Sequence, residues 1–247
     1  MMRTFFAAIV TLGILAGCKP QSTVAVQPNQ ADSALIRMVE HRIEEKKELD
    51  KLRWQLERSN FMQHIARYKP IIKKYAKRYG FDYRLIIAQI IQESGFKMHA
   101  RSRVGARGLM QIMPGTAREL SRELDVEYIM LTPRENIAAG IYHLYKQYAY
   151  FPDAPKPDRI KLALASYNCG AGRVFDAQDI ARFYKQPANR WETVKPYLAM
   201  LKKEDWQLHL QVWPEGKPPH GYFYGYEETI RYVENIWNMY QMYRKIL

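Results

Sequence analysis

Apolar residues recur at the period of an α-helix along most of this chain of 247 residues, and this periodicity restricts the fold more than any other feature. The strongest segment runs from Leu85 to Ile91. It follows Asp82, a residue type that caps helix N-termini, and precedes Gly95, a residue type that ends helices. No strand-like alternation extends over more than a few residues, and no internal repeat is present. The sequence therefore predicts a mainly α fold in which the helix before Gly95 is buried.

Three further helices are predicted downstream. Residues 132–135 form the pattern Thr-Pro-Arg-Glu, a capping box with proline at the first helical position, and a helix follows it. A second helix is expected from about 158 to 168, where Gly170 and Gly172 let the chain turn, and a last one from about 226 to 245. The stretch 213–221 is rich in proline and glycine and is predicted to be a loop.

The first 17 residues have the pattern of a bacterial signal peptide. Arg3 supplies a positive start, and residues 5–16 form an apolar stretch too short to span a bilayer as a helix. Residues 15–18 read Leu-Ala-Gly-Cys, which resembles the lipobox of bacterial lipoproteins, where cleavage precedes the cysteine and a diacylglyceryl group joins its thiol. Cys18 is thus the predicted lipidation site, which would hold the protein at a membrane surface. The alternative is an ordinary signal peptide with a chance cysteine.

The rest of the N-terminal region divides into a tether and a charged helix. Residues 18–31 hold the predicted lipidated cysteine and a polar linker. Lys19 rather than Asp follows the cysteine, which in similar Gram-negative lipoproteins implies the outer membrane, facing the periplasm. Residues 32–69 are highly charged with an apolar stripe, which predicts a long amphipathic helix that packs on its own domain or acts as a stalk, with a coiled-coil partner as the alternative. Pro70 interrupts the pattern, and a compact helical domain is expected over 70–247.

The net charge of +13 attracts polyanions without choosing among them. Nucleic acid, anionic lipid and the carboxylate-bearing peptides of a cell wall all qualify. The basic residues are spread along the chain instead of forming one arm, which weakens the nucleic-acid interpretation. We therefore expect no nucleic-acid partner.

The cysteines and histidines predict little chemistry. Two cysteines, Cys18 and Cys169, cannot form a disulfide framework, and Cys169 is expected to be a small buried apolar residue rather than a nucleophile. The six histidines lack the usual spacing of metal ligands. We expect neither a metal nor a cofactor.

Glu93 is the residue best placed for acid–base chemistry. It follows Gln89 and Ile90 at helical spacing, so it prolongs the face of a buried helix, and it lies near that helix's C-terminus. Burial and the negative end of the helix dipole both disfavour a carboxylate, so we expect the pKa of Glu93 to be raised, as a general acid near neutral pH requires. The alternative is a surface glutamate in a last turn. The arginines that could fold over the carboxylate and lower its pKa are Arg101, Arg103 and Arg107.

Five motifs in a fixed order surround this glutamate. They are Glu93-Ser94-Gly95; residues 100–114 with Ala-Arg-Ser followed by Gly-Ala-Arg-Gly-Leu-Met-Gln-Ile-Met-Pro; Asn136 to Gly140; Ala165 to Gly172; and Glu228 to Val233. Together they resemble the catalytic domain of the soluble-type, family 1 (SLT) lytic transglycosylases. The resemblance covers roughly residues 71–243. Any one motif is weak, but five in the right order with ordinary spacing are specific.

The resemblance implies a lysozyme-like helical domain with Glu93 as the single acid/base. The residues that it implies for substrate binding are Ser102, Gln111, Met113, Tyr167, Asn168 and Glu228. The amide of Gln111 can donate to and accept from N-acetylated sugars, and Met113 offers a soft apolar wall. For Gln111 and Asn168 the alternative is that they stabilise a loop or cap a helix.

The activity that the resemblance implies is cleavage of the bond between N-acetylmuramic acid and N-acetylglucosamine in peptidoglycan glycan strands, with 1,6-anhydro ends formed. A raised acid that begins the reaction protonated predicts an optimum on the mildly acidic side of neutral. Three alternatives stay open: a goose-type-like muramidase, in which water attacks instead; a non-catalytic cell-wall-binding lipoprotein; and a basic membrane- or nucleic-acid-binding protein. Oligomeric state has no signal in the sequence.

Overall fold

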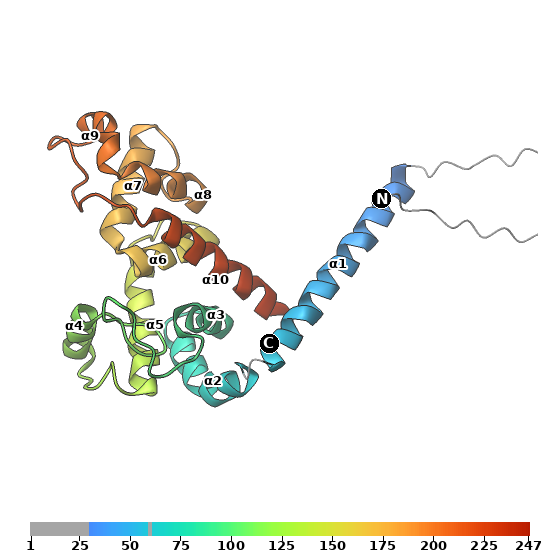
Figure 1. Cartoon of the computed structure of the whole chain (residues 1–247). Coiled ribbons are helices and arrows are strands. Elements are labelled where there is room, and N and C mark those ends of the chain that lie inside the picture. The colour runs from blue at the N-terminus through green and yellow to red at the C-terminus, as the bar shows by residue number, and fades with distance from the viewer. Residues whose placement is uncertain (1–29, 59–60) are drawn as a thin grey trace, which may run out of the picture. The chain divides into compact units, whose positions relative to one another are not determined.

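The computed structural model describes residues 30–58 and 61–247, and every regular element within these ranges is a helix (Figure 1). Extended pairing in this part of the chain is limited to isolated bridges at Arg101–Arg107 and Arg107–Ile112. The predicted mainly α fold is therefore confirmed. No helix among the described residues combines the length and apolarity needed to cross a membrane. The predicted signal peptide, Cys18 and most of the tether lie outside the described residues.

The chain divides into two units, residues 1–46 and 47–247, which are described separately. The N-terminal unit contains the first part of helix α1 (Gln30–Arg58), a charged helix in the region where one was predicted. The predicted helix was longer, to residue 69, whereas α1 ends at Arg58 and a second helix begins at Phe61.

The second unit contains the remaining helices. They are α2 (Phe61–Arg78), α3 (Tyr83–Ser94), α4 (Pro114–Leu124), α5 (Pro133–Ala149), α6 (Lys156–Cys169), α7 (Ala171–Phe183), the short α8 (Trp191–Val194) and α9 (Trp206–Val212), two 3₁₀ turns at 195–200 and 203–205, and α10 (Tyr226–Ile246). Helix α3 packs against α2 and α10, and α6 packs against α5, α7 and α10 (Figure 1). The last helix of the chain thus lies against the helix that carries Glu93.

Helix α3 is the buried helix that the sequence predicts. All residues from Leu85 to Ile90 are buried, Gln89 included. The Asp82 side chain accepts a hydrogen bond from the backbone N–H of Arg84, which caps the N-terminus. Gly95 ends the helix in the left-handed region with φ of 56°, and its N–H donates to the Ile91 carbonyl. Both boundaries are confirmed.

The other predicted helices also form. Helices α5, α6 and α10 begin or end within two residues of the predicted positions, and residues 213–221 are irregular. The capping box before α5 differs in detail, because the Thr132 hydroxyl donates to the Glu135 carboxylate and no side chain caps the backbone N–H groups. Proline at the first helical position removes one of the donors that such a cap would serve.

Pro70, where the sequence predicts the start of the compact domain, lies inside α2. The buried residues of α2 include Ile65 and Tyr68 before the proline and Ile72 after it, and all three belong to one core. A proline inside a helix removes one backbone hydrogen bond, at a cost of about 3 kcal/mol. Burying each large apolar side chain contributes about 1.5–3 kcal/mol of stability, which offsets the cost of the proline. The helix therefore continues past Pro70.

Of the two glycines expected to turn the chain after α6, only Gly170 does so. It has φ of 89° between α6 and α7. Gly172 lies within α7, and a Cβ there would come within 2.3 Å of the His220 ring. The His220 ring and backbone N–H are held by the Asp176 carboxylate of α7, at 2.8 and 3.0 Å. The second glycine therefore makes room for the loop that packs onto α7.

The loop between α3 and α4 is held in place by Asn136, a buried residue in the first turn of α5. Its Oδ1 accepts from the Met110 N–H at 2.8 Å, and its Nδ2 donates to the carbonyls of Arg107 at 3.1 Å and Ile129 at 3.0 Å. Gly108, with φ of 81°, passes so close that a Cβ there would lie 2.4 Å from the same amide. One side chain thus fixes the path of the segment that carries three of the predicted site residues, Ser102, Gln111 and Met113.

We expect Asn136→Ala to lower the free energy of unfolding by about 2–4 kcal/mol, because it leaves the buried Met110 N–H and the Ile129 carbonyl without these partners and removes one of two hydrogen bonds to the Arg107 carbonyl. The measurement is urea unfolding followed by circular dichroism. Asn238→Ala on the exposed side of α10 is the control, and it should change stability by less than about 0.5 kcal/mol. Equal effects of the two substitutions would contradict the role of Asn136.

Candidate active site

Glu93 lies in the last turn of α3, where its carboxylate meets α10. The Tyr232 hydroxyl donates to Glu93 Oε1 at 2.5 Å, and the Gln89 amide donates to the same hydroxyl at 3.2 Å. Tyr232 and Gln89 are buried, and Glu93 keeps part of its side chain accessible. The packing of α10 on α3 therefore builds a chain of hydrogen bonds from Gln89 through Tyr232 to Glu93.

Burial raises the pKa of Glu93 to about 8, and the hydrogen bond from Tyr232 lowers it only in part. The raised pKa that the sequence predicts is confirmed in direction. Arg101 and Arg103 are exposed in the loop, and neither they nor Arg107 contribute to the shift. A carboxyl with this pKa is mostly protonated at neutral pH, so it can donate a proton to a bound group and later accept one.

A second tyrosine, Tyr167 of α6, lies close to the same carboxylate. Its pKa is raised well above the usual value, by burial first and then by the charge of Glu93. Its hydroxyl donates to the Met110 carbonyl at 2.7 Å. The ring of His143 lies 4.9 Å from the Tyr167 ring, and burial lowers the pKa of His143 to about 4, so this histidine is neutral. Tyr167 therefore supports the loop through its hydroxyl.

The same loop is tied directly to the end of α3. Ser94, next to Glu93, donates from its hydroxyl to the Leu109 carbonyl at 2.9 Å. With Asn136 on the Met110 N–H and Tyr167 on the Met110 carbonyl, three side chains from three helices fix two consecutive loop residues beside Glu93. The position of this backbone relative to the carboxylate is thus set by hydrogen bonds.

Ser102 and Gln111 shape the loop from within. Ser102 Oγ accepts from the Ala106 N–H at 3.0 Å. The Gln111 amide donates to the carbonyls of Gly108 at 2.8 Å and Ala100 at 3.2 Å, and its backbone has φ of 44° in the left-handed region. The donor side of Gln111 therefore stabilises the loop, which is the alternative considered from the sequence.

Met113, Asn168 and Glu228 lie at the surface. Met113 precedes α4 and is 40% exposed. Asn168, near the end of α6, accepts a hydrogen bond from the Thr229 hydroxyl at 2.7 Å. Glu228, which precedes Thr229 in the first turn of α10, is exposed. The hydrogen bond between Asn168 and Thr229 joins α6 to α10. Within the described residues, no hydrogen bond links Met113, Asn168 or Glu228 to Glu93.

Sequence reasoning assigned no role to Tyr232, Gln89, Asn136 or His143. Three of them carried a signal: Tyr232 and Asn136 lie in two of the five motifs, and Gln89 lies one helical turn before Glu93. Nothing in the spacing indicates that the two turns face each other, because 139 residues separate Tyr232 from Glu93.

The remaining candidates for chemistry are few. Burial raises the pKa of the Cys169 thiol to about 11, so the thiolate needed by a nucleophile is scarce at neutral pH. In the part of the chain that the structure describes, no three side chains of His, Cys, Asp or Glu gather as metal ligands would. Glu93 is therefore the group whose environment best suits proton transfer.

We expect Tyr232→Phe to raise the pKa of Glu93 by about one pH unit, because the substitution removes a hydroxyl that favours the carboxylate. Titration of the labelled Glu93 carboxyl by ¹³C NMR measures this directly. Tyr240→Phe on the same helix is the matched control, since that hydroxyl donates to Asp82 instead. An unchanged or lowered pKa in Tyr232→Phe would refute the assigned hydrogen bond.

We expect Glu93→Gln to stabilise the fold at alkaline pH. The pKa of Glu93 is about 8 in the folded chain against an ordinary value of 4.5, so the folded state binds more protons between these values. The stability of the parent therefore falls by up to about 5 kcal/mol as pH rises from about 4.5 to about 8, and it levels off above that. Unfolding in urea at pH 4 and pH 9 should give the variant a higher free energy of unfolding than the parent only at pH 9. A difference that does not change with pH would argue against the raised pKa.

The chain is similar to known proteins over the segment that carries Glu93. A protein-family model described as transglycosylase SLT domain matches residues 70–190. The membrane-bound lytic murein transglycosylase F of Desulfosudis oleivorans is 36% identical over 184 residues, which cover 73% of this chain and 37% of that protein. The protein of the same name from Marinobacter nauticus is 34% identical over 193 residues, 75% of this chain and 35% of that protein.

Among solved structures, the lytic transglycosylase Slt of Pseudomonas aeruginosa is 29% identical with a TM-score of 0.47, covering 72% of this chain and 24% of that one. The chain spans just over a third of the length of the curated relatives it matches. The matched family segment contains Glu93, the loop that Asn136 and Tyr167 hold, and those two residues themselves. Residues 70–190 of this chain are therefore a transglycosylase SLT domain.

Proposed function

We propose that this protein is a peptidoglycan lytic transglycosylase in which Glu93 is the single acid/base. The observation that carries the proposal is a carboxyl at the end of a buried helix, with a pKa of about 8 and a tyrosine hydroxyl donating to it. It lies in an SLT domain, and the two relatives described above are named as lytic murein transglycosylases. The substrate is the glycan strand of peptidoglycan.

The first step uses the protonated carboxyl. Glu93 donates its proton to the glycosidic oxygen between N-acetylmuramic acid and N-acetylglucosamine, and the bond from that oxygen to the muramyl C1 breaks. The substrate's own acetamide oxygen stabilises the cationic C1, as in substrate-assisted glycosidases, so a second catalytic carboxylate is not required. The proton is available at neutral pH because burial keeps the carboxyl protonated.

The second step uses the carboxylate that the first step leaves. Glu93 takes the proton of the muramyl C6 hydroxyl, and that oxygen bonds to C1 to close the 1,6-anhydro ring. Tyr232 stabilises the carboxylate between the steps by donating to Oε1. The proton taken from C6 restores the acid, so the cycle balances without water.

The substrate-binding residues are proposed on the same basis. Met113 offers its exposed thioether as an apolar wall for a sugar ring. Ser102 and Gln111 act mainly by shaping the loop, as their hydrogen bonds to loop backbone indicate. Tyr167 holds that loop beside Glu93, and we assign contacts with more distant sugar units to Asn168 and Glu228.

The proposal extends to location and domain organisation. Residues 1–17 form a lipoprotein signal peptide, Cys18 carries lipid, 18–31 is a tether, 32–69 is a charged helical region and 70–247 is the enzyme domain. The relatives are named membrane-bound, which supports attachment in the cell envelope. The residue after Cys18 is Lys19, which favours the outer membrane facing the periplasm.

We expect the parent to release muropeptides from purified sacculi with 1,6-anhydro ends, one water lighter than hydrolytic products by mass spectrometry. Glu93→Gln should lower the initial rate at least about a thousandfold while the protein stays folded, because it removes the only proton donor. Glu204→Gln, at an exposed position, is the control for loss of one negative charge. Products carrying the extra water would identify a muramidase, and a fully active Glu93→Gln would refute the mechanism.

We expect Cys18→Ala to abolish membrane attachment, because it removes the thiol that would carry the lipid. Expression with a labelled fatty acid, followed by detergent phase partitioning, measures this. Cys169→Ala is the matched control and should leave labelling unchanged. Equal fatty-acid labelling of Cys18→Ala and the parent would contradict the proposed anchor.

A further inference from the structure

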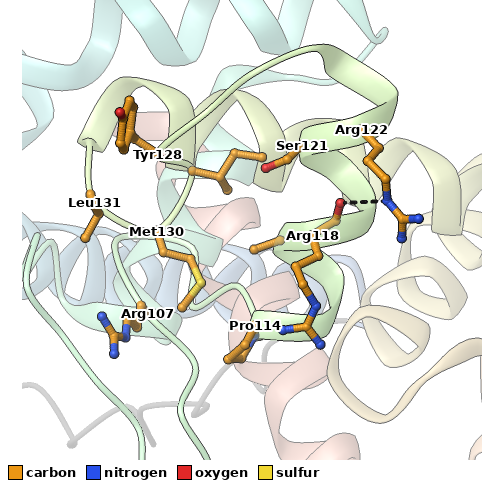
Figure 2. Close-up of a pocket in the computed structure, with 10 residues that line it drawn as sticks. Arg107, Pro114, Arg118, Ser121, Arg122, Tyr128, Met130 and Leu131 are labelled. Carbon is orange, nitrogen blue, oxygen red and sulfur yellow. Dashed lines mark hydrogen bonds between the residues drawn. The ribbon is translucent and has the colours of Figure 1, made fainter.

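A large cavity lies away from Glu93, between α4 and the turn before α5 (Figure 2). Its volume is about 840 Å³. The apolar part of its lining includes Pro114, Ala117, Ile129 and Met130. Glu93 does not line it, so the cavity is separate from the candidate active site.

Three arginines and no acidic residue line this cavity. Arg107 comes from the loop between α3 and α4, and Arg118 and Arg122 come from α4. Figure 2 shows Arg107 and Arg118 on opposite sides of Met130. Arg122 donates to the Arg118 carbonyl at 3.3 Å. A recess with this lining attracts anions, and its apolar floor favours an anion that also carries small apolar groups.

The acidic residues of α4 do not neutralise these arginines. Glu119 and Glu123 bind Lys146 of α5 instead, at 2.5 and 2.7 Å. Arg118 and Arg122 lie one turn apart along the helix on the face that lines the cavity. Among the ion pairs within the described residues, none involves Arg107, Arg118 or Arg122. The positive charge of the cavity is therefore uncompensated.

The rim of the cavity holds exposed apolar groups in a strained turn. Tyr128 has φ of 60°, in the left-handed region that tyrosine rarely adopts, and its carbonyl accepts from the Leu131 and Thr132 N–H groups. Tyr128 is 63% exposed and Leu131 is 62% exposed. Backbone strain that holds large apolar side chains in water is typical of a surface that binds a ligand.

The cavity is also continuous with the loop beside Glu93. Arg107, which lines it, is three residues before Met110, whose carbonyl Tyr167 holds. At the other end, the cavity wall starts at Pro114, directly after Met113. A substituent attached to a sugar at Met113 therefore has a short path into the cavity.

We propose that this cavity binds the acidic stem peptide that hangs from the glycan strand, and this rests on the proposed function. Guanidinium groups of Arg107 and Arg118 bind its carboxylates in two-pronged hydrogen bonds, and the apolar floor accepts its alanine methyl groups. A phosphate headgroup is a poorer match, because it leaves the apolar floor and the exposed Tyr128 and Leu131 without a partner.

The test measures binding of a free synthetic stem peptide to the full chain by titration calorimetry at constant ionic strength. We expect Arg118→Gln to weaken binding about tenfold, the effect of one lost charge-assisted hydrogen bond. Arg103→Gln removes the same charge from an exposed loop position outside the cavity and should leave the affinity unchanged. A peptide with amidated carboxyl groups should bind the parent as weakly as the acidic peptide binds Arg118→Gln.

Three outcomes would overturn the proposal. They are no measurable binding of the acidic peptide to the parent, equal weakening by Arg103→Gln and Arg118→Gln, and binding of glycerol 3-phosphate but not the peptide in an Arg118-dependent way. Because the free peptide has no glycosidic bond, this test does not depend on cleavage. Failure of the proposed function would appear separately, as a parent that releases no anhydro products from sacculi.

Cleavage supplies a second readout. Arg118→Gln should lower, about tenfold, the ratio of kcat/KM on peptide-bearing strands to kcat/KM on strands stripped of peptide by an amidase. Arg103→Gln should leave that ratio unchanged. An unchanged ratio in Arg118→Gln would mean that the cavity does not bind the stem peptide during catalysis, and it would overturn the proposal.

Discussion

The hydrogen bond from Tyr232 to Glu93 is the interaction on which the site depends. A carboxyl at the end of an apolar helix resists ionisation, since burial removes water from the charge. The tyrosine hydroxyl compensates in part, which leaves a pKa of about 8 that lies near the working range of an acid and a base. The bond exists because α10 packs along α3, so the last helix of the chain supplies the hydroxyl that contacts Glu93.

Around this pair the protein keeps the neighbouring backbone rigid. Ser94, Asn136 and Tyr167 each fix a backbone group at Leu109 or Met110, from α3, α5 and α6 respectively. Hydrogen bonds from regular elements hold a loop more firmly than contacts within the loop do. Gln111 and Ser102 then shape the remainder from inside. The arrangement places a polar, preorganised loop next to a carboxyl that is costly to ionise.

The acidic and basic side chains of α4 have different surroundings. Its glutamates neutralise Lys146 on one side, while its arginines face a recess on the other. Three of the basic residues of the chain thus line one cavity without acidic partners. A basic recess beside the loop between α3 and α4 attracts anions, which fits the acidic stem peptide that we propose for it.

Local sequence patterns were enough to predict the helices with clear caps and periodicity, such as α3 between Asp82 and Gly95, and to identify Glu93 as a raised acid. They missed α7, whose buried face includes Asp176 and Gln178, because buried polar residues hide the apolar period. They also misjudged Pro70 and Gly172, whose roles depend on the core under α2 and on the His220 ring. Only the packing of distant helices could decide that Tyr232 meets Glu93 or that Asn136 holds Met110, since helical period describes neighbours a few residues apart and carries no information on which faces meet.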